Sequence, residues 1–341
     1  MIQVIPFRVD PKSFHELIVQ PQFGDILGED GNVTQPSDEE GDWMIIDNQR
    51  HSLPIIDMFG GQNLIKRRDA TCKLIYSPVA KLGARYITDE KLYAATEDCQ
   101  EEFYQGCFDD YTAQNFDIFG EKVLPMLEKG VAADLYSNKY FGDISRPSDT
   151  NGVWSWNKLN GIFYHYAEYV AQNIVAAPIA IPANPTPAQV YALLNQMVAN
   201  QDEILDSFDD TDKAIYVNKK LYDLLGDFYV MGGVGTISLS ELQAGRAQLF
   251  VRGIEVKPKK WNGILKALNG GTQGHAAILT LRGNFLYKTD STYGGGPKRN
   301  EAVRIWWSDD DNVWKRQIHF RSGTNIAAPQ HSVLAWTNDL F

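Results

Sequence analysis

Short apolar runs interrupted by prolines dominate the first sixty residues of the chain. The prolines are Pro6, Pro11, Pro21, Pro36 and Pro54. Prolines at this density prevent a regular helix, because each removes a backbone donor and fixes φ. The apolar residues between them are too numerous for a solvated tail. We therefore expect residues 1–60 to form an extended arm, packed either on another molecule or on its own domain.

The next stretch predicts a strand pair followed by a helix. Residues 71–77 and 81–88 are two short strand-like runs around the Ser77-Pro78 turn. Residues 89–108 carry an apolar stripe at spacings of three and four, which predicts a helix. The stripe consists of Leu92, Ala95, Cys99, Phe103 and Cys107.

A four-residue apolar repeat predicts a second, longer helix over residues 117–138. The repeat continues across Pro125, so we expect a kink there and not two separate helices. Residues 140–143 should form the turn after this helix, with Gly142 as a glycine available for a left-handed conformation.

The middle of the chain mixes helices and strands. An aromatic-rich helix is expected at 160–175. A second one starts with Thr186, Pro187 and Gln189, the pattern of a capping box with proline at the first helical position. Its apolar face extends to Phe208. A strand at 214–217, a short helix, a glycine-rich segment and a strand at 249–256 follow.

The C-terminal third changes to a period of two, which predicts strands. Runs at 276–281, 284–288, 302–307, 313–320 and 333–336 fit this pattern. Residues 308–312 have the composition of a hairpin turn. The chain is therefore predicted to be an α+β protein.

Composition narrows the class of protein. The chain has 341 residues, 44% hydrophobic and 22% charged, with a formal net charge of −11. This length suggests about two domains. Tight nucleic-acid binding is disfavoured, because such affinity comes from Lys and Arg. A wall that merely encloses DNA should instead repel it.

Neither cysteine usage nor targeting signals indicate secretion. The three cysteines are Cys72, Cys99 and Cys107, and no CxxC occurs, so buried thiols in a reducing compartment are expected. The sequence lacks a signal-peptide pattern and a long apolar run, so we expect synthesis in a cytoplasm and no membrane association.

A search for chemistry finds no catalytic, cofactor or metal motif. The six histidines lack metal-ligand spacing, and no G-x-S-x-G elbow occurs. Gly232, Gly233 and Gly235 lack the Gly-Lys-Ser/Thr end of a phosphate loop. The acidic run around Asp206–Asp212 lacks the glycine and glutamate of a calcium loop. We therefore expect no enzyme activity and no cofactor.

Several segments resemble the major capsid proteins of tailed bacteriophages with the Hong Kong 97-type fold, and most closely those of phages that infect Bacteroidetes. The resemblance lies in residues 213–222 (KAIYVNKKLY), 249–256 (LFVRGIEV), 277–287 (AILTLRGNFLY), 303–307 (VRIWW) and 318–327 (IHFRSGTNIA). Residues 139–145 (KYFGDIS) are similar to the turn after that family's spine helix. The match covers roughly residues 70–336 in order and texture.

The resemblance implies a division of the chain into five parts. Residues 1–60 would be an N-terminal arm and 61–88 an extended hairpin loop. Residues 89–147, with a spine helix at 117–138, and residues 273–341, with long strands, would form the peripheral domain. Residues 148–272 would form the axial domain.

The same resemblance implies partners, and the charge pattern of the chain adds candidate contact residues. Copies of the chain would assemble into pentamers and hexamers of an icosahedral shell in the virion, made in a bacterial host. The shell would enclose double-stranded DNA, with a portal and a separate scaffolding protein as further partners. Candidate inter-subunit contacts are Lys66, Arg67 and Arg68, with Asp38, Glu39, Glu40, Asp42 and residues 97–102 as acidic partners. Gly232, Gly233 and Gly235 would lie near the capsomer centre.

Two other interpretations stay open at this point. One is an encapsulin-like bacterial compartment, which has the same fold and a different cargo. The other is a soluble two-domain enzyme whose active site is scattered along the sequence.

Overall fold

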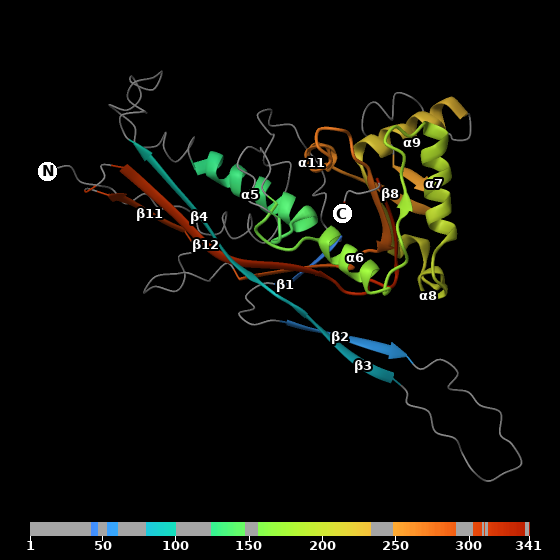
Figure 1. The fold of residues 1–341 in the computed structure, drawn as a ribbon, viewed down its shortest axis with the longest axis horizontal. Helices are drawn as coiled ribbons and strands as arrows, with labels where there is room; N and C mark the ends of the chain where they lie inside the picture. Colours follow the sequence, from blue (N-terminus) through green and yellow to red (C-terminus); the bar gives the residue numbers. More distant parts are fainter. Residues whose placement is uncertain are drawn as a thin grey trace, which may run out of the picture.

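The computed structural model describes residues 42–46, 53–60, 80–99, 124–146, 156–232, 248–290, 303–308, 310, 313–337 and 341. Helices and strands are mixed along these segments, which form a five-stranded sheet, a six-stranded sheet and a two-stranded hairpin (Figure 1). The predicted α+β class is therefore confirmed.

The five-stranded sheet is organised around β12 (Val313–Ile326), which has 14 residues. One edge of β12 pairs with β11 (Val303–Ser308) and then with β10 (Phe285–Asp290), both antiparallel. The other edge pairs with β4 (Glu90–Cys99) over ten residues. β1 (Trp43–Ile46) adds a parallel strand beyond β10. The predicted hairpin at 302–320 is present, and its second strand is longer than expected.

The predicted helix over 89–108 is wrong for the residues that the structure describes there. Residues 90–99 form strand β4, and residues 100–108 lie outside the described part of the chain. Leu92 and Ala95 suit a helical stripe, but long-range pairing with β12 decides the conformation. Local propensity is a weak guide where a strand is held by a partner distant in sequence.

Helix α5 (Leu124–Phe141) lies along the five-stranded sheet, and helix α6 (Ile162–Ala171) follows it (Figure 1). The described part of the predicted spine helix ends three residues later than expected. Pro125 is the second described residue of α5, and residues 117–123 lie outside the described part of the chain, so the kink expected at Pro125 stays a prediction. Gly142 is not among the residues with positive φ. It is needed because a Cβ would collide with the Leu159 carbonyl.

The six-stranded sheet has the order β5-β13-β9-β6-β8-β7. Its strands are β5 (Ile179–Ala180), β13 (Ser332–Trp336), β9 (Ala276–Leu281), β6 (Lys213–Asn218), β8 (Ile254–Lys259) and β7 (Leu249–Val251). The single strand expected at 249–256 is a hairpin, because Arg252 and Gly253 turn the chain with positive φ. β9 and β13 pair within this sheet, although the sequence-based division assigns them to the peripheral domain; that division stays a prediction.

Helices α7 (Pro187–Ala199), α8 (Glu203–Ser207) and α9 (Lys219–Gly232) stand at one end of the molecule (Figure 1). The capping box of α7 is confirmed: Gln189 N donates to Thr186 Oγ1, and Thr186 N donates to Gln189 Oε1. The helix stops at Ala199, short of the expected Phe208. Asp202 caps α8 as a separate helix, which leaves Ile204 and Phe208 46% and 42% exposed.

Two short helical segments complete the fold. The 3-10 turn at Asp210–Asp212 precedes β6, and helix α11 (Asn262–Leu268), which the periodicity did not predict, follows β8.

Strands β2 (Leu53–Gly60) and β3 (Ala80–Ile87) form an antiparallel hairpin that projects away from the two larger sheets (Figure 1). β3 agrees with the predicted strand at 81–88. Within the predicted arm, residues 43–46 pair with β10 of their own chain and residues 53–60 belong to this hairpin. Residues 1–41 lie outside the described part.

Two hydrophobic cores flank the six-stranded sheet. One is rich in aromatic residues and joins α5, α6 and α11 to both sheets. Its fully buried side chains include Trp261, Tyr140 and Phe163. The other is aliphatic and lies between the sheet and helices α7 and α9. These cores fix the frame from which the hairpin projects.

Candidate assembly elements

Asp42 fixes the point where the N-terminal segment meets the core. Its side chain is fully buried, and it accepts bonds from Lys257 Nζ at 2.6 Å, Lys259 Nζ at 2.9 Å and Tyr216 OH at 3.0 Å. Burial raises the pKa of Asp42, but the two lysines outweigh burial and leave that pKa below its ordinary value. The carboxylate is therefore charged and held on strands β6 and β8.

Trp43, the next residue, secures the same segment through its ring. Its Nε1 donates to Tyr140 OH on α5 at 3.0 Å. Lys139 Nζ lies 4.2 Å from the centre of the Trp43 ring, within the range of a cation–π contact. The start of β1 is thus held on strands β6 and β8 through Asp42 and on helix α5 through Trp43.

Arg85 on β3 anchors the base of the projecting hairpin. Its guanidinium donates to Tyr169 OH at 2.8 Å, to the Ile326 carbonyl at 2.9 Å and to the Ala327 carbonyl at 2.6 Å. Tyr169 OH in turn donates to Asn325 Oδ1 at 2.8 Å. The fork of an arginine fixes direction as well as distance. The hairpin is thereby oriented against α6 and the end of β12.

The backbone after the hairpin is fastened by a second set of contacts. Asn325 Nδ2 donates to the Tyr86 carbonyl at 3.1 Å. Asp89 accepts from Lys288 Nζ at 2.7 Å and from Arg321 at 3.4 Å. Gly323 of β12 has no room for a Cβ, because the Thr88 carbonyl lies against it. The chain between β3 and β4 is therefore packed closely on β12 and β10.

His165 on α6 lies behind the Arg85 anchor. Burial lowers its pKa from 6.5 to about 4; a hydrogen bond with the Thr324 backbone opposes this, and the nearby charge of Arg85 adds to it. At neutral pH the imidazole is therefore uncharged, and no second positive charge competes with Arg85.

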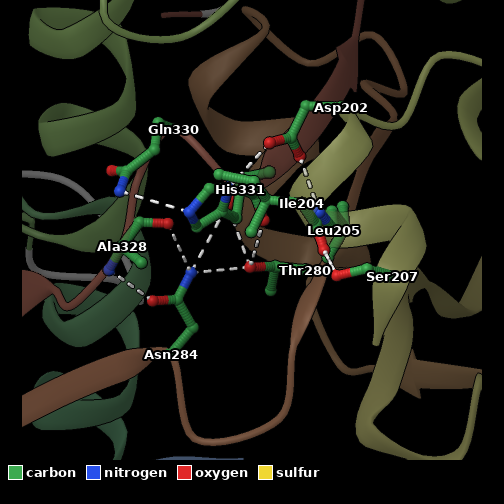
Figure 2. A network of polar contacts seen from close by, with 10 residues as sticks. Asp202, Ile204, Leu205, Ser207, Thr280, Asn284, Ala328, Gln330 and His331 are labelled. Atoms are coloured by element: carbon green, nitrogen blue, oxygen red, sulfur yellow. Dashed lines mark hydrogen bonds and ion pairs between the residues drawn. The ribbon is translucent and has the colours of Figure 1, made fainter. Parts of the chain in front are cut away.

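Asn284 joins the two large sheets where the chain crosses between them (Figure 2). Its Nδ2 donates to Thr280 Oγ1 at 2.6 Å and to the Ala328 carbonyl at 3.1 Å, while its Oδ1 accepts from Ala328 N at 2.7 Å. Thr280 lies on β9 of the six-stranded sheet, and Ala328 follows the end of β12 in the five-stranded sheet. One buried amide therefore connects the two sheets.

His331 extends this network to α8. Its Nδ1 lies 2.8 Å from Asp202 Oδ2, while Asp202 Oδ1 accepts from Leu205 N at 3.2 Å (Figure 2). Asp202 thus caps α8 and ties it to the start of β13.

The structure describes only part of the site predicted from sequence. Lys66, Arg67, Arg68, Asp38, Glu39, Glu40, Gly233 and Gly235 lie outside the described residues. Gly232 is the last residue of α9. Glu97 is exposed on strand β4 and not on a helix. Asp42, which the sequence grouped with the acidic partners, is wrong in that role because it is buried against Lys257 and Lys259.

Sequence reasoning missed Arg85, Asp89 and Asn284. Each is a single polar residue whose partners lie far away in the chain, so no local spacing marks it. Among the described residues, no group of three His, Cys, Asp or Glu side chains is arranged to hold a metal ion. In the same part of the chain, every helix is too short or too polar to span a bilayer.

Comparison with known proteins finds solved structures of similar fold, but no protein of similar sequence. No family model matches the sequence, and no curated protein matches it significantly. A chain from the procapsid of satellite phage P4, which includes the size determination protein, is similar with a TM-score of 0.51 and 11% identity, over 82% of each chain. A chain from Mycobacterium phage Ogopogo gives 0.54 at 8% identity, over 97% of this chain and 100% of that one.

A third similar structure is a chain from Gordonia phage Cozz, with a TM-score of 0.50 and 12% identity, over 86% of this chain and 82% of that one. Identities this low establish the fold alone. The fold is that of the Hong Kong 97-type capsid proteins of phages, as the sequence resemblance implied.

Proposed function

We propose that this chain is the structural subunit of a phage head. Copies assemble into pentamers and hexamers that close into an icosahedral shell around double-stranded DNA. The observation that carries this proposal is the similarity of fold to the procapsid chain of satellite phage P4. The hairpin supports it, since β2 and β3 project from the body on a base that Arg85 and Asp89 hold rigidly.

The net charge of −11 fits a container better than a DNA-binding protein. DNA is enclosed by the shell and not gripped tightly by it. A portal and a separate scaffolding protein are the further partners. The chain is made in the cytoplasm of a bacterial host, of the kind that Bacteroidetes phages infect, and ends in the virion.

Purified full-length protein tests this proposal directly. We expect electron microscopy and sedimentation velocity to detect closed shells built of five- and six-membered rings as concentration rises. A monodisperse monomer at high concentration would contradict the proposal. An encapsulin-like compartment, the alternative with the same fold, predicts shells with protein cargo; DNA recovered from native particles would exclude it.

Within the shell, we assign Lys66, Arg67 and Arg68 to a contact with acidic residues of a neighbouring copy. Asp38, Glu39, Glu40 and the acidic residues of 97–102 are the partners, and Asp42 is removed from this set. Charge complementarity fixes the register between partners more than it adds affinity. Reversing all three basic residues should impair assembly while leaving the thermal transition of the monomer unchanged. Equal damage to the monomer would instead make the cluster structural.

Gly232, Gly233 and Gly235 are assigned to the centre of the ring, exposed and without nucleotide. A shell reconstruction that puts residue 232 at the periphery of the capsomer would contradict this assignment.

A further inference from the structure

One long segment of the chain carries no charge. Residues 169–201, between Glu168 and Asp202, contain no Asp, Glu, Lys or Arg, although charged residues make up 22% of the sequence. The segment covers the end of α6, the edge strand β5 and the whole of α7.

Much of this segment is on the surface of the single chain. We use the term charge-free face for the exposed residues between 171 and 200, which include Ile174, Ala183, Gln189, Ala192 and Gln196. Ile174 is 42% exposed, which is high for a large aliphatic side chain. On α7 the exposed positions are alanine and glutamine, and the buried positions are Val190, Leu193, Leu194 and Met197.

The helices next to α7 do carry charged residues on their surface. Helices α8 and α9 stand beside α7 at the same end of the molecule (Figure 1) and expose Glu203, Asp206, Lys219 and Asp223. The lack of charge therefore belongs to this segment and not to the whole end of the molecule. One charged neighbour reaches it, because Arg252 of the turn between β7 and β8 donates from Nε to Asn195 Oδ1 on α7 at 2.9 Å.

We propose that the charge-free face is a surface through which neighbouring copies of this chain contact one another. This inference rests on the proposed self-assembly. Copies with a net charge of −11 repel each other, and like charges brought together at an interface are strongly unfavourable. Close contact is least opposed on a surface with few charges, here bordered by Arg252 alone among the contacts described above, and depletion of charged residues marks the core of protein interfaces.

The contact is made by side chains and not by strand addition. β5 pairs with β13 over only two residues, and Pro178 and Pro182 flank it. A proline cannot donate to a ladder, so this edge does not accept another strand. The exposed side of α7, with Ala192 and Gln196, is the part that a neighbour can pack against.

Substitutions at Ala192 test the proposal. We would compare A192E, A192K and the uncharged A192Q with wild type by sedimentation velocity, after confirming an unchanged thermal transition. An unpaired charge is costly in an interface, so A192K should raise the concentration needed for assembly at least about tenfold. A192E should raise it by less, because Arg252 is bound to Asn195 three residues along α7 and offsets the new carboxylate. A192Q should assemble nearly as wild type does.

Thr211 supplies the matched control. It is exposed between Asp210 and Asp212, on a surface already charged, so T211E and T211K should leave assembly unchanged. Normal assembly of both A192E and A192K would overturn the inference. So would a defect only in binding a different protein, with self-assembly intact. Failure of wild type to assemble would instead refute the proposed function.

Discussion

Arg85 illustrates how one residue controls a whole projecting element. Three hydrogen bonds of its guanidinium join β3 to α6 and to the end of β12. Replacement by methionine keeps the length and removes these charged hydrogen bonds, which typically contribute about 1.5–3 kcal/mol each. Because Arg85 is only half-buried, water replaces part of what is lost, and we expect R85M to lower the free energy of unfolding by about 2–4 kcal/mol, less than the sum of three such bonds. Hydrogen exchange in residues 80–87 should rise.

The control is K266M, since Lys266 is exposed on α11. It should change neither quantity. If exchange in the hairpin were the same in R85M and wild type, Arg85 would not be its anchor.

Asp42 is the second residue with a large predicted effect. D42N leaves Lys257 and Lys259 facing a neutral amide, and breaking a buried pair by removing one partner costs about 3–5 kcal/mol. Denaturant titration measures the loss. D223N removes an exposed pair with Lys219 and should cost less than about 1 kcal/mol. Equal effects of the two changes would argue against a special role for Asp42.

The pH dependence of stability separates His165 from Asp42. The pKa of His165 falls from 6.5 to about 4 on folding. Between these two pH values the imidazole is protonated in the unfolded chain and neutral in the folded chain. The free energy of unfolding should therefore fall by up to about 3 kcal/mol as pH drops through that interval. His275, whose pKa is also lowered by burial, adds a slope of the same sign.

Asp42 behaves differently, because its pKa in the folded chain is lowered from the ordinary value of 3.8. Its contribution to stability is therefore lost only as pH falls below about 3.8. Denaturant unfolding at several pH values from 7 to 4 distinguishes the two. H165Q should flatten the slope in this interval, whereas D42N should lower stability at every pH and keep the slope. An unchanged slope in H165Q would show that other groups titrate there.

At the scale of elements, the start of α7 gives the clearest prediction. Thr186 accepts from Gln189 N, and removing an N-cap hydroxyl typically costs about 1 kcal/mol. T186A should lower the free energy of unfolding by that amount, while T186S should not. Denaturant titration of both variants provides the measurement.

The same helix explains which elements the sequence predicts well. Its capping box is local, since Thr186 and Gln189 are three residues apart, and it is present as expected. β4 is held instead by β12, more than two hundred residues away, so the stripe of Leu92 and Ala95 indicated the wrong conformation. The end of α7 was missed for a related reason: Asp202 starts a new helix that His331 holds from a distant strand.

At the scale of the whole molecule, the pattern of elements predicted the α+β class, and the resemblance to phage capsid proteins predicted the fold, with which the similar structures agree. The anchors of the hairpin could not be predicted. Arg85 contacts residues 326 and 327, and Asp89 contacts residue 288, so each contact exists only once the two sheets are assembled.

The net charge leads to a final prediction about assembly and salt. Repulsion between copies of charge −11 acts over a distance set by ionic strength, about 10 Å at 0.1 M and about 3 Å at 1 M. A contact through the charge-free face contains no ion pair for salt to weaken, whereas the contact assigned to Lys66, Arg67 and Arg68 does. We expect the repulsion between whole copies to be the larger of the two effects. Added sodium chloride should therefore lower the concentration at which wild-type copies assemble, as light scattering can measure. The variant with Lys66, Arg67 and Arg68 reversed has greater repulsion and should gain more from salt. Assembly that weakens steadily with salt in the wild type would show that ion pairs, and not the uncharged surface of α7, dominate the contacts between copies.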